Sequence, residues 1–131
     1  MNPSKAAPPR PTQTELEILR VLWQRGPSSV REVHQIMLET RVAGYTTVLK
    51  LMQIMARKGL VVRDERERTH VYRVAFAQEQ TQRQLLTDLL DRAFDGSASQ
   101  LILQALASKR TSPDDMEEIR KMLDQAQRRS S

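Results

Sequence analysis

The feature that most constrains the fold lies between residues 44 and 74, where a helical pattern gives way to two short β-like segments. The spacing predicts a helix from about Tyr45 to Lys58, and Gly59 supplies the left-handed residue that commonly ends a helix. Two runs of strand-forming residues follow, Val61–Glu65 and Thr69–Val74, with three charged residues between them. A helix, a glycine cap and a basic hairpin in this order predict the second half of a winged helix-turn-helix.

The predicted helix has an apolar face and a polar face. The apolar residues that should face the core are Val48, Leu51, Met52 and Met55. The outer face carries hydroxyl, amide and basic side chains, which are the groups that contact base edges and phosphates in a DNA major groove. These outer residues are Thr46, Thr47, Lys50, Gln53 and Arg57. The residues expected to contact DNA, from this helix and from the hairpin, are Tyr45, Thr46, Thr47, Lys50, Arg57, Arg63, Arg66 and Arg68.

Several of these residues have a simpler alternative role. Thr46 and Thr47 could cap the helix, and Tyr45 could be partly buried. Lys50 and Arg57 could be ordinary solvated charges. The hairpin arginines lie among acidic residues, so part of their charge could be neutralised within the hairpin. At least one of them is nevertheless expected to contact a phosphate.

The segments before residue 44 predict two further helices. Thr12 and Glu15 form a capping box, and Ser29 and Glu32 form a second one. Gly26-Pro27 separates the two helices. Residues 1–11 contain four prolines and no periodicity, which is typical of a flexible arm. The predicted organisation is an arm over residues 1–11, a winged-helix head over 12–76 and a helical tail over 77–131.

The apolar spacing in the tail predicts three helices with wide apolar faces. They extend over Gln78–Phe94, over Ser97–Ala107 and from Pro113 onward. A unit of this size buries too little surface to be stable alone, so the faces should pack on the head or on a second copy. A dimer would place two heads on a two-fold axis, as reading an inverted repeat requires. The residues expected at the dimer interface are Leu85, Leu86, Leu89, Leu90, Phe94, Leu101, Ile102, Leu106, Ile119 and Leu123.

Charge is distributed unevenly between these parts. Residues 1–76 hold 13 basic and 7 acidic residues, whereas residues 77–131 hold 8 and 9. The formal net charge of +5 therefore comes from the head, which favours a polyanion as its partner. The chain has no cysteine, and its two histidines have no ligand partners at metal spacing, so neither a metal nor another cofactor is expected. No signal peptide or apolar run of about 18 residues is present, so a cytoplasmic protein is expected.

A family resemblance rests on the order and spacing of several segments. They are Thr12–Trp23, Gly26-Pro27, Val30-Arg31-Glu32-Val33, Tyr45-Thr46-Thr47-Val48, Arg57-Lys58-Gly59-Leu60-Val61, His70-Val71-Tyr72, Leu89–Ser97 and Met116–Leu123. Together they resemble the BlaI/MecI/CopY family of bacterial repressors over roughly residues 12–126. The resemblance implies a winged-helix head, a dimerisation tail and repression of target promoters. It also implies relief of repression by a membrane sensor-protease, or by copper in the CopY branch.

The chain departs from that family pattern at specific places. The CopY branch uses a cysteine-rich hook, which this chain lacks, so the resemblance is to the BlaI/MecI branch. Repressors of the β-lactam branch are cut at an Asn-Phe bond in the helix that matches Ser97–Ala107, and the matching pair here is Gln104-Ala105. Many relatives also have other residues at Leu49, Lys50 and Ile54, so the resemblance does not carry their operator sequence over to this chain.

Three alternatives to a DNA-binding repressor without a small-molecule ligand are an enzyme, a protein-interaction module and a repressor controlled by a small molecule. An enzyme would need a convergent acid, base or nucleophile set, and the acids here lie in caps, the hairpin and the last helix. A winged helix used only for protein interaction would present an apolar or acidic outer face. A repressor controlled by a small molecule would need a polar ligand cluster, which the sequence does not reveal. The prediction is a homodimeric, mainly α-helical repressor that binds an inverted-repeat operator.

Overall fold

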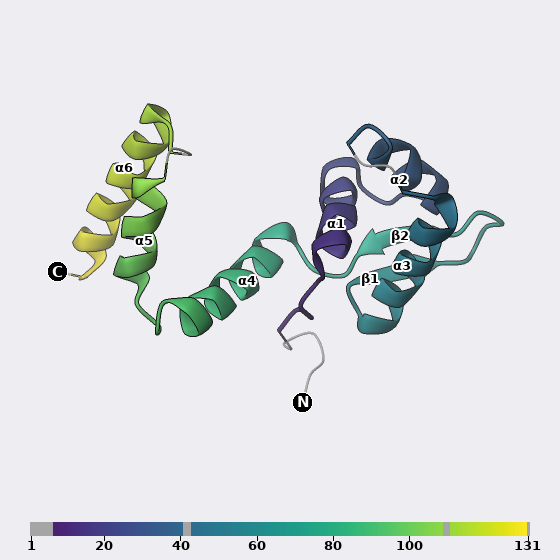
Figure 1. Ribbon diagram of the computed structural model, residues 1–131, viewed down its shortest axis with the longest axis horizontal. Helices are drawn as coiled ribbons and strands as arrows, with labels where there is room; N and C mark the ends of the chain where they lie inside the picture. Colours follow the sequence, from purple (N-terminus) through teal and green to yellow (C-terminus); the bar gives the residue numbers. More distant parts are fainter. Residues whose placement is uncertain (1–6, 41–42, 109–110, 131) are drawn as a thin grey trace. The chain divides into compact units, whose positions relative to one another are not determined.

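The computed structural model describes residues 7–40, 43–108 and 111–130 (Figure 1). The described residues form α1 (Gln13–Arg25), α2 (Val30–Met37), α3 (Tyr45–Lys58), β1 (Val61–Asp64), β2 (Val71–Val74), α4 (Gln78–Ala93), α5 (Ala98–Ala107) and α6 (Pro113–Ser130). The fold is therefore mainly helical with one antiparallel hairpin, and the predicted fold class is confirmed.

The chain divides into two compact units, Met1–Leu86 and Thr87–Ser131. The division lies inside α4, whereas the sequence places the end of the head at residue 76. Most of the predicted N-terminal arm, residues 1–6, lies outside the described residues. No helix among the described residues combines the length and the apolar character that crossing a bilayer requires.

Local capping explains where the first helices begin and end. The Glu15 backbone N–H donates to Thr12 Oγ1 at 3.2 Å, and the Thr12 N–H donates to Glu15 Oε1 at 2.8 Å. Ser29 and Glu32 make the same reciprocal pair at 3.2 and 2.9 Å. Gly59 ends α3 with φ of 87°, a conformation that L side chains disfavour. Both predicted capping boxes and the glycine cap are confirmed.

The core of the first unit joins α1, α2, α3 and the hairpin. Its buried members are Ile18, Leu19, Leu22, Val30, Val33, Met37, Val48, Met52, Met55, Leu60, Val61 and Tyr72. Leu51, which the sequence places in this core, is half-buried at its edge. Val48, Met52 and Met55 recur at i, i+4 and i+7 and define the centre of the buried face of α3. Leu51 lies at the edge of that face.

The hairpin is fixed to the helices through the loop between α1 and α2. β1 and β2 pair from Val61 opposite Val74 to Asp64 opposite Val71, slightly shorter than the predicted segments. Ser28 extends this ladder, because its N–H donates to the Tyr72 carbonyl at 3.0 Å and its carbonyl accepts the Tyr72 N–H at 2.8 Å. Tyr72 is itself buried in the core. The base of the hairpin therefore has a fixed position relative to α2 and α3.

The first turns of α4 complete the first unit. The Trp23 indole Nε1–H donates to the Phe76 carbonyl at 3.1 Å, which holds the segment after β2 against α1. Thr81, in the first turns of α4, is only 2% exposed. The start of α4 is therefore part of the packed first unit.

The second unit contains the rest of α4 with α5 and α6. Ser97 caps α5 by accepting the Gln100 N–H at 3.3 Å, and Ser112 accepts the Asp115 N–H at 3.1 Å before α6. No residue is fully buried in the described part of this unit, 87–108 and 111–130. Its half-buried apolar residues are Leu90, Phe94, Leu101, Leu106 and Ile119. Its exposed ones are Leu89, Ile102, Leu103, Met116, Met122 and Leu123.

Candidate nucleic-acid interface

The solvent face of α3 carries a row of polar side chains. Thr46, Lys50, Gln53 and Arg57 are all exposed, and they recur at i, i+4, i+7 and i+11. This spacing places them along one face of a straight helix, opposite the buried face. Thr47 is also exposed and lies to one side of this row, on the same flank as Ile54. α3 contains no acidic residue, so this surface offers donors, hydroxyls and positive charge.

The start of α3 excludes one alternative for the two threonines. The N-cap residue is Gly44, and no side chain makes a capping hydrogen bond there. Neither Thr46 nor Thr47 is therefore the cap of this helix. Their exposed hydroxyls remain available to another partner.

Tyr45 is positioned by α2. Its ring meets the His34 ring edge-on, with 5.8 Å between centroids and 87° between planes. The His34 Nε2–H donates to the Ala43 carbonyl at 2.8 Å, which gives the imidazole a structural role. Tyr45 is still 47% exposed, so it lies at the rim of the α3 surface rather than in the core.

Two hairpin arginines are engaged by neighbouring acids. Arg66 donates to both carboxylate oxygens of Asp64, with Arg66 Nη2 to Asp64 Oδ2 at 2.6 Å. These side-chain hydrogen bonds lower the pKa of Asp64 to about 2. Arg63 forms an ion pair with Glu65. The pKa of Arg63 is raised mainly by a hydrogen bond with the Tyr72 side chain, and to a smaller extent by the charge of Glu65. The predicted partial neutralisation within the hairpin therefore applies to Arg63 and Arg66.

Arg68 differs from its neighbours in the hairpin. It is exposed, and within residues 7–40, 43–108 and 111–130 it forms no ion pair. Lys50 and Arg57 on α3 are also exposed without an ion pair in that part of the chain. These three cations are therefore the uncompensated ones among the predicted DNA contacts.

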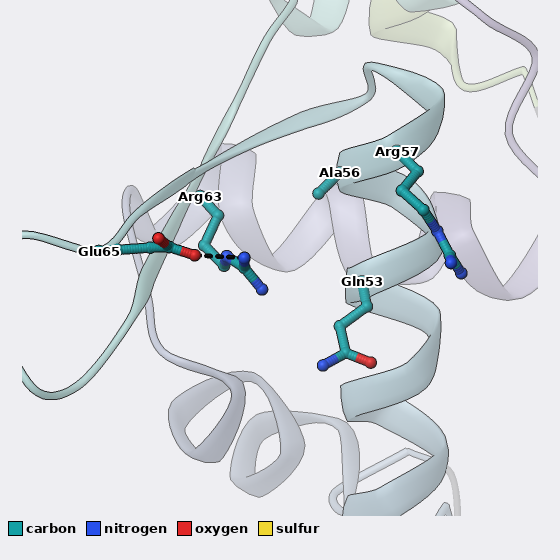
Figure 2. A pocket seen from close by; sticks show the side chains of 5 residues that line it. All are labelled: Gln53, Ala56, Arg57, Arg63 and Glu65. Carbon is teal, nitrogen blue, oxygen red and sulfur yellow. Dashed lines mark ion pairs between the residues drawn. The ribbon is translucent and has the colours of Figure 1, made fainter.

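Two hollows are lined by residues of both α3 and the hairpin. One, of about 550 Å³, lies at the C-terminal half of α3 (Figure 2). Gln53 and Ala56 point from α3 toward Arg63 on β1, while Arg57 extends along the other side of the helix. A second hollow, of about 340 Å³, lies nearer the start of α3. It is lined by Ser29, Val30, Arg31, Tyr45, Leu49, Gln53, Arg63, Arg68, Thr69, His70 and Tyr72.

Two residues at this surface are absent from the predicted DNA contacts, although the sequence places one of them, Gln53, on the outer face of the helix. Gln53 lies in the outward row of α3, and its spacing of seven residues from Thr46 is a signal for it in the sequence. Arg31 lies in the first turn of α2 beside a capping box, and it lines the same hollow as Tyr45 and Arg68. No local pattern places Arg31 there, because the approach of α2 to the hairpin is a tertiary contact.

A fold of three helices and a hairpin, with an acid-free polar helix face and basic side chains beside it, defines a winged-helix DNA-binding protein. The similarity of the chain to known proteins agrees with this class. The chain belongs to the penicillinase repressor family, whose model matches residues 11–125. This is a family of transcriptional repressors and not of enzymes, and the predicted resemblance to the BlaI/MecI branch is confirmed.

Individual relatives cover most of the chain. Transcriptional regulator BlaI of Mycobacterium tuberculosis, in strain CDC 1551 / Oshkosh and in strain ATCC 25618 / H37Rv, is 30% identical over 110 residues. The match spans 83% of this chain and 79% of each relative. Among solved structures, a MarR family protein from Bacillus stearothermophilus is 21% identical, with a TM-score of 0.49 over 92% of this chain and 75% of that one.

Proposed function

We propose that this winged-helix regulator is a homodimeric, cytoplasmic repressor that binds an inverted-repeat operator through α3 and the hairpin. The observation that carries the proposal is the outward row of Thr46, Lys50, Gln53 and Arg57 on an acid-free helix. Hydroxyl, amide and cationic side chains are the groups that read base edges in the major groove. An interaction module without DNA would favour an apolar or acidic face here.

The second unit supports the dimer. An isolated helical unit with no fully buried residue in its described part has not completed a core. We expect the core to be completed by a second copy, because a two-fold dimer pairs the same surface of both chains. Three predicted interface residues of this unit are exposed and available for this, Leu89, Ile102 and Leu123, and Leu86 at the end of the first unit is exposed as well. The other six, Leu85, Leu90, Phe94, Leu101, Leu106 and Ile119, are half-buried.

Exposed apolar residues outside the predicted set extend this proposed interface. Leu103, at 60% exposed, lies on α5, and Met116 and Met122 lie on α6. A large part of each of these apolar side chains is exposed to water in the described unit. Burial against a second copy would remove their apolar surface from water, which is the main driving force for stable dimers.

A membrane sensor-protease remains a proposed partner, and Gln104-Ala105 is the bond that corresponds to the cleavage site of the β-lactam branch. The bond lies in the last turn of α5. The Gln104 carbonyl accepts the Ser108 N–H at 3.1 Å, and the Ala105 carbonyl accepts hydrogen bonds from the Ser108 and Thr111 hydroxyls at 2.7 and 3.1 Å. Cleavage at this bond would require the last turn of α5 to open first.

A salt titration of operator binding tests the proposed function. If a dimer neutralises about six to ten phosphates, affinity should fall by roughly 10³–10⁵ between 50 and 200 mM salt. The DNA can be selected from fragments of the source genome, since the operator sequence need not be known beforehand. Binding that hardly depends on salt, or no binding to any fragment at low salt, would contradict the proposal.

A further inference from the structure

We propose that Arg31 at the start of α2 and Arg68 at the tip of the hairpin jointly hold one phosphate of the DNA backbone. The inference rests on the proposed function and adds a phosphate site to it. The site is the hollow of about 340 Å³ bounded by α2, α3 and the hairpin. It assigns a role in DNA binding to Arg31, which lies outside both α3 and the hairpin.

The charge of this hollow distinguishes it from its neighbours. Three arginines line it, Arg31, Arg63 and Arg68, and no carboxylate does. Each of the other hollows described around the hairpin has an acid in its wall: Glu65 in one, Asp64 and Glu65 in the second, Asp64 and Glu67 in the third. An anion would therefore meet net positive charge in this hollow and mixed charge in the others.

The ion pairs of the hairpin identify which arginines are available. Arg63 already pairs with Glu65, so part of its charge is compensated. Arg31 and Arg68 form no ion pair within the described ranges 7–40, 43–108 and 111–130, and both are exposed. A guanidinium presents five N–H donors in a fork that matches phosphate oxygens. Two such groups, one from α2 and one from the hairpin, line this hollow and together supply donors for a tetrahedral anion.

The expected path of DNA places a backbone strand at this hollow. A recognition helix lies in the major groove, and a wing beside it approaches the neighbouring minor groove. One phosphodiester strand separates the two grooves, so it must pass between α3 and the hairpin. Tyr45, Leu49 and Gln53 line the hollow from the α3 side. The first turn of α2 lines the hollow through Arg31.

The test uses the full-length chain and three single variants. Arg31→Ala and Arg68→Ala should each weaken binding on all DNA sequences alike, and loss of both should reduce the slope of log affinity against log salt by about one, because the two arginines neutralise one phosphate between them. Arg20→Ala is the matched control, because it removes the same charge from an exposed position on α1 that does not line the hollow. Equal weakening by Arg20→Ala and Arg31→Ala would overturn the inference, as would weakening confined to one DNA sequence.

A conservative variant and a double variant sharpen the result. Arg31→Lys keeps the charge and removes the fork, so it should preserve the salt slope while weakening binding several-fold. The double variant Arg31→Ala, Arg68→Ala should weaken binding by less than the product of the two single effects, because both residues act on one phosphate. Independent, fully multiplicative effects would overturn the shared site. Circular dichroism should show wild-type helix content in every variant.

Modified DNA locates the phosphate directly. An operator with one uncharged methylphosphonate linkage should weaken wild-type binding at one position, and Arg31→Ala should no longer respond at that position. Exchanging chloride for inorganic phosphate at constant ionic strength should change the DNA affinity of the wild-type protein by no more than about twofold. A larger weakening that depends on Arg31 would mean that the hollow binds free phosphate, and it would overturn the inference. Absence of wild-type DNA binding would overturn the proposed function as well, whereas unchanged binding by Arg31→Ala overturns only the shared phosphate site.

Discussion

Within α3, neighbouring positions have opposite roles. Lys50 is exposed in the outward row, and Met52, two positions later, is 0% exposed in the core. The helix period of 3.6 residues separates these two faces. Substitutions on the two faces should therefore affect DNA binding and stability separately, which makes the orientation of α3 measurable.

Lys50→Ala should reduce DNA binding and leave stability nearly unchanged. The side chain is exposed, and exposed substitutions usually change stability by less than about 0.5 kcal/mol. If Lys50 contacts a base edge, operator binding should weaken by about 1–3 kcal/mol. A paired thermal melt and operator titration measures both. Wild-type binding by this variant would show that another part of α3 faces the groove.

Met52→Ala should have the opposite effect. Met52 is fully buried beside Val48 and Met55, so truncation should cost about 2–5 kcal/mol of unfolding free energy. Leu51→Ala, at the edge of the same core, should cost clearly less. Denaturant unfolding of the two variants tests this order, and equal effects would mean that Leu51 is as buried as the sequence pattern alone suggests.

The sequence predicts those features of single residues that depend on near neighbours. The two capping boxes and the Gly59 cap involve residues within three or four positions, and all three are predictable. The pairing of Arg66 with Asp64 is predictable only as a general neutralisation, because side-chain geometry decides which acid each arginine meets. The position of Arg31 depends on three elements packing together, and no local signal contains it.

An ion pair links the start of α1 to the end of α3. Lys58 Nζ lies 2.6 Å from Glu15 Oε1 and donates to the Arg10 carbonyl at 3.4 Å. Glu15 is 2% exposed and also accepts the Thr12 N–H. Burial raises the pKa of Glu15, but the hydrogen bonds from Lys58 and Thr12 outweigh it, so the pKa is lowered. The separation of 43 residues between the partners explains why the sequence does not reveal this pair.

This ion pair predicts acid sensitivity of the first unit. A carboxylate with a lowered folded-state pKa contributes its full stability above the unfolded pKa, and that contribution disappears as the pH falls through the folded pKa. Stability should therefore decline with acid below the ordinary Glu pKa of 4.5. Glu15→Gln should be less stable at neutral pH and less sensitive to acid over that range. Melting temperatures across the pH series check this, and parallel curves for both proteins would contradict it.

For the whole molecule, the two units differ in how far each completes its own structure. The described residues of the first unit include twelve buried apolar ones, and this unit carries the basic excess of the chain. The described part of the second unit has no fully buried residue and exposes apolar side chains on its helices. The sequence indicates this contrast through the charge distribution and the wide apolar faces. It does not indicate that the first turns of α4 pack with the head, because Thr81 gives no apolar signal there.

A fragment of residues 1–86 should therefore fold alone and remain monomeric. It retains the full core together with Thr81 and the Trp23–Phe76 hydrogen bond. Without the second unit it should bind the operator more weakly by about 10²–10⁴, since two linked heads gain from effective concentration. A shorter fragment ending at residue 76 removes the segment that contains the buried Thr81 and should melt at a lower temperature. Sedimentation measures the assembly of each fragment, and operator titration measures its affinity. A fragment 1–86 that dimerises as tightly as the full chain would place the dimer interface in the head. A full-length chain that is monomeric at micromolar concentration would contradict the role proposed for the tail.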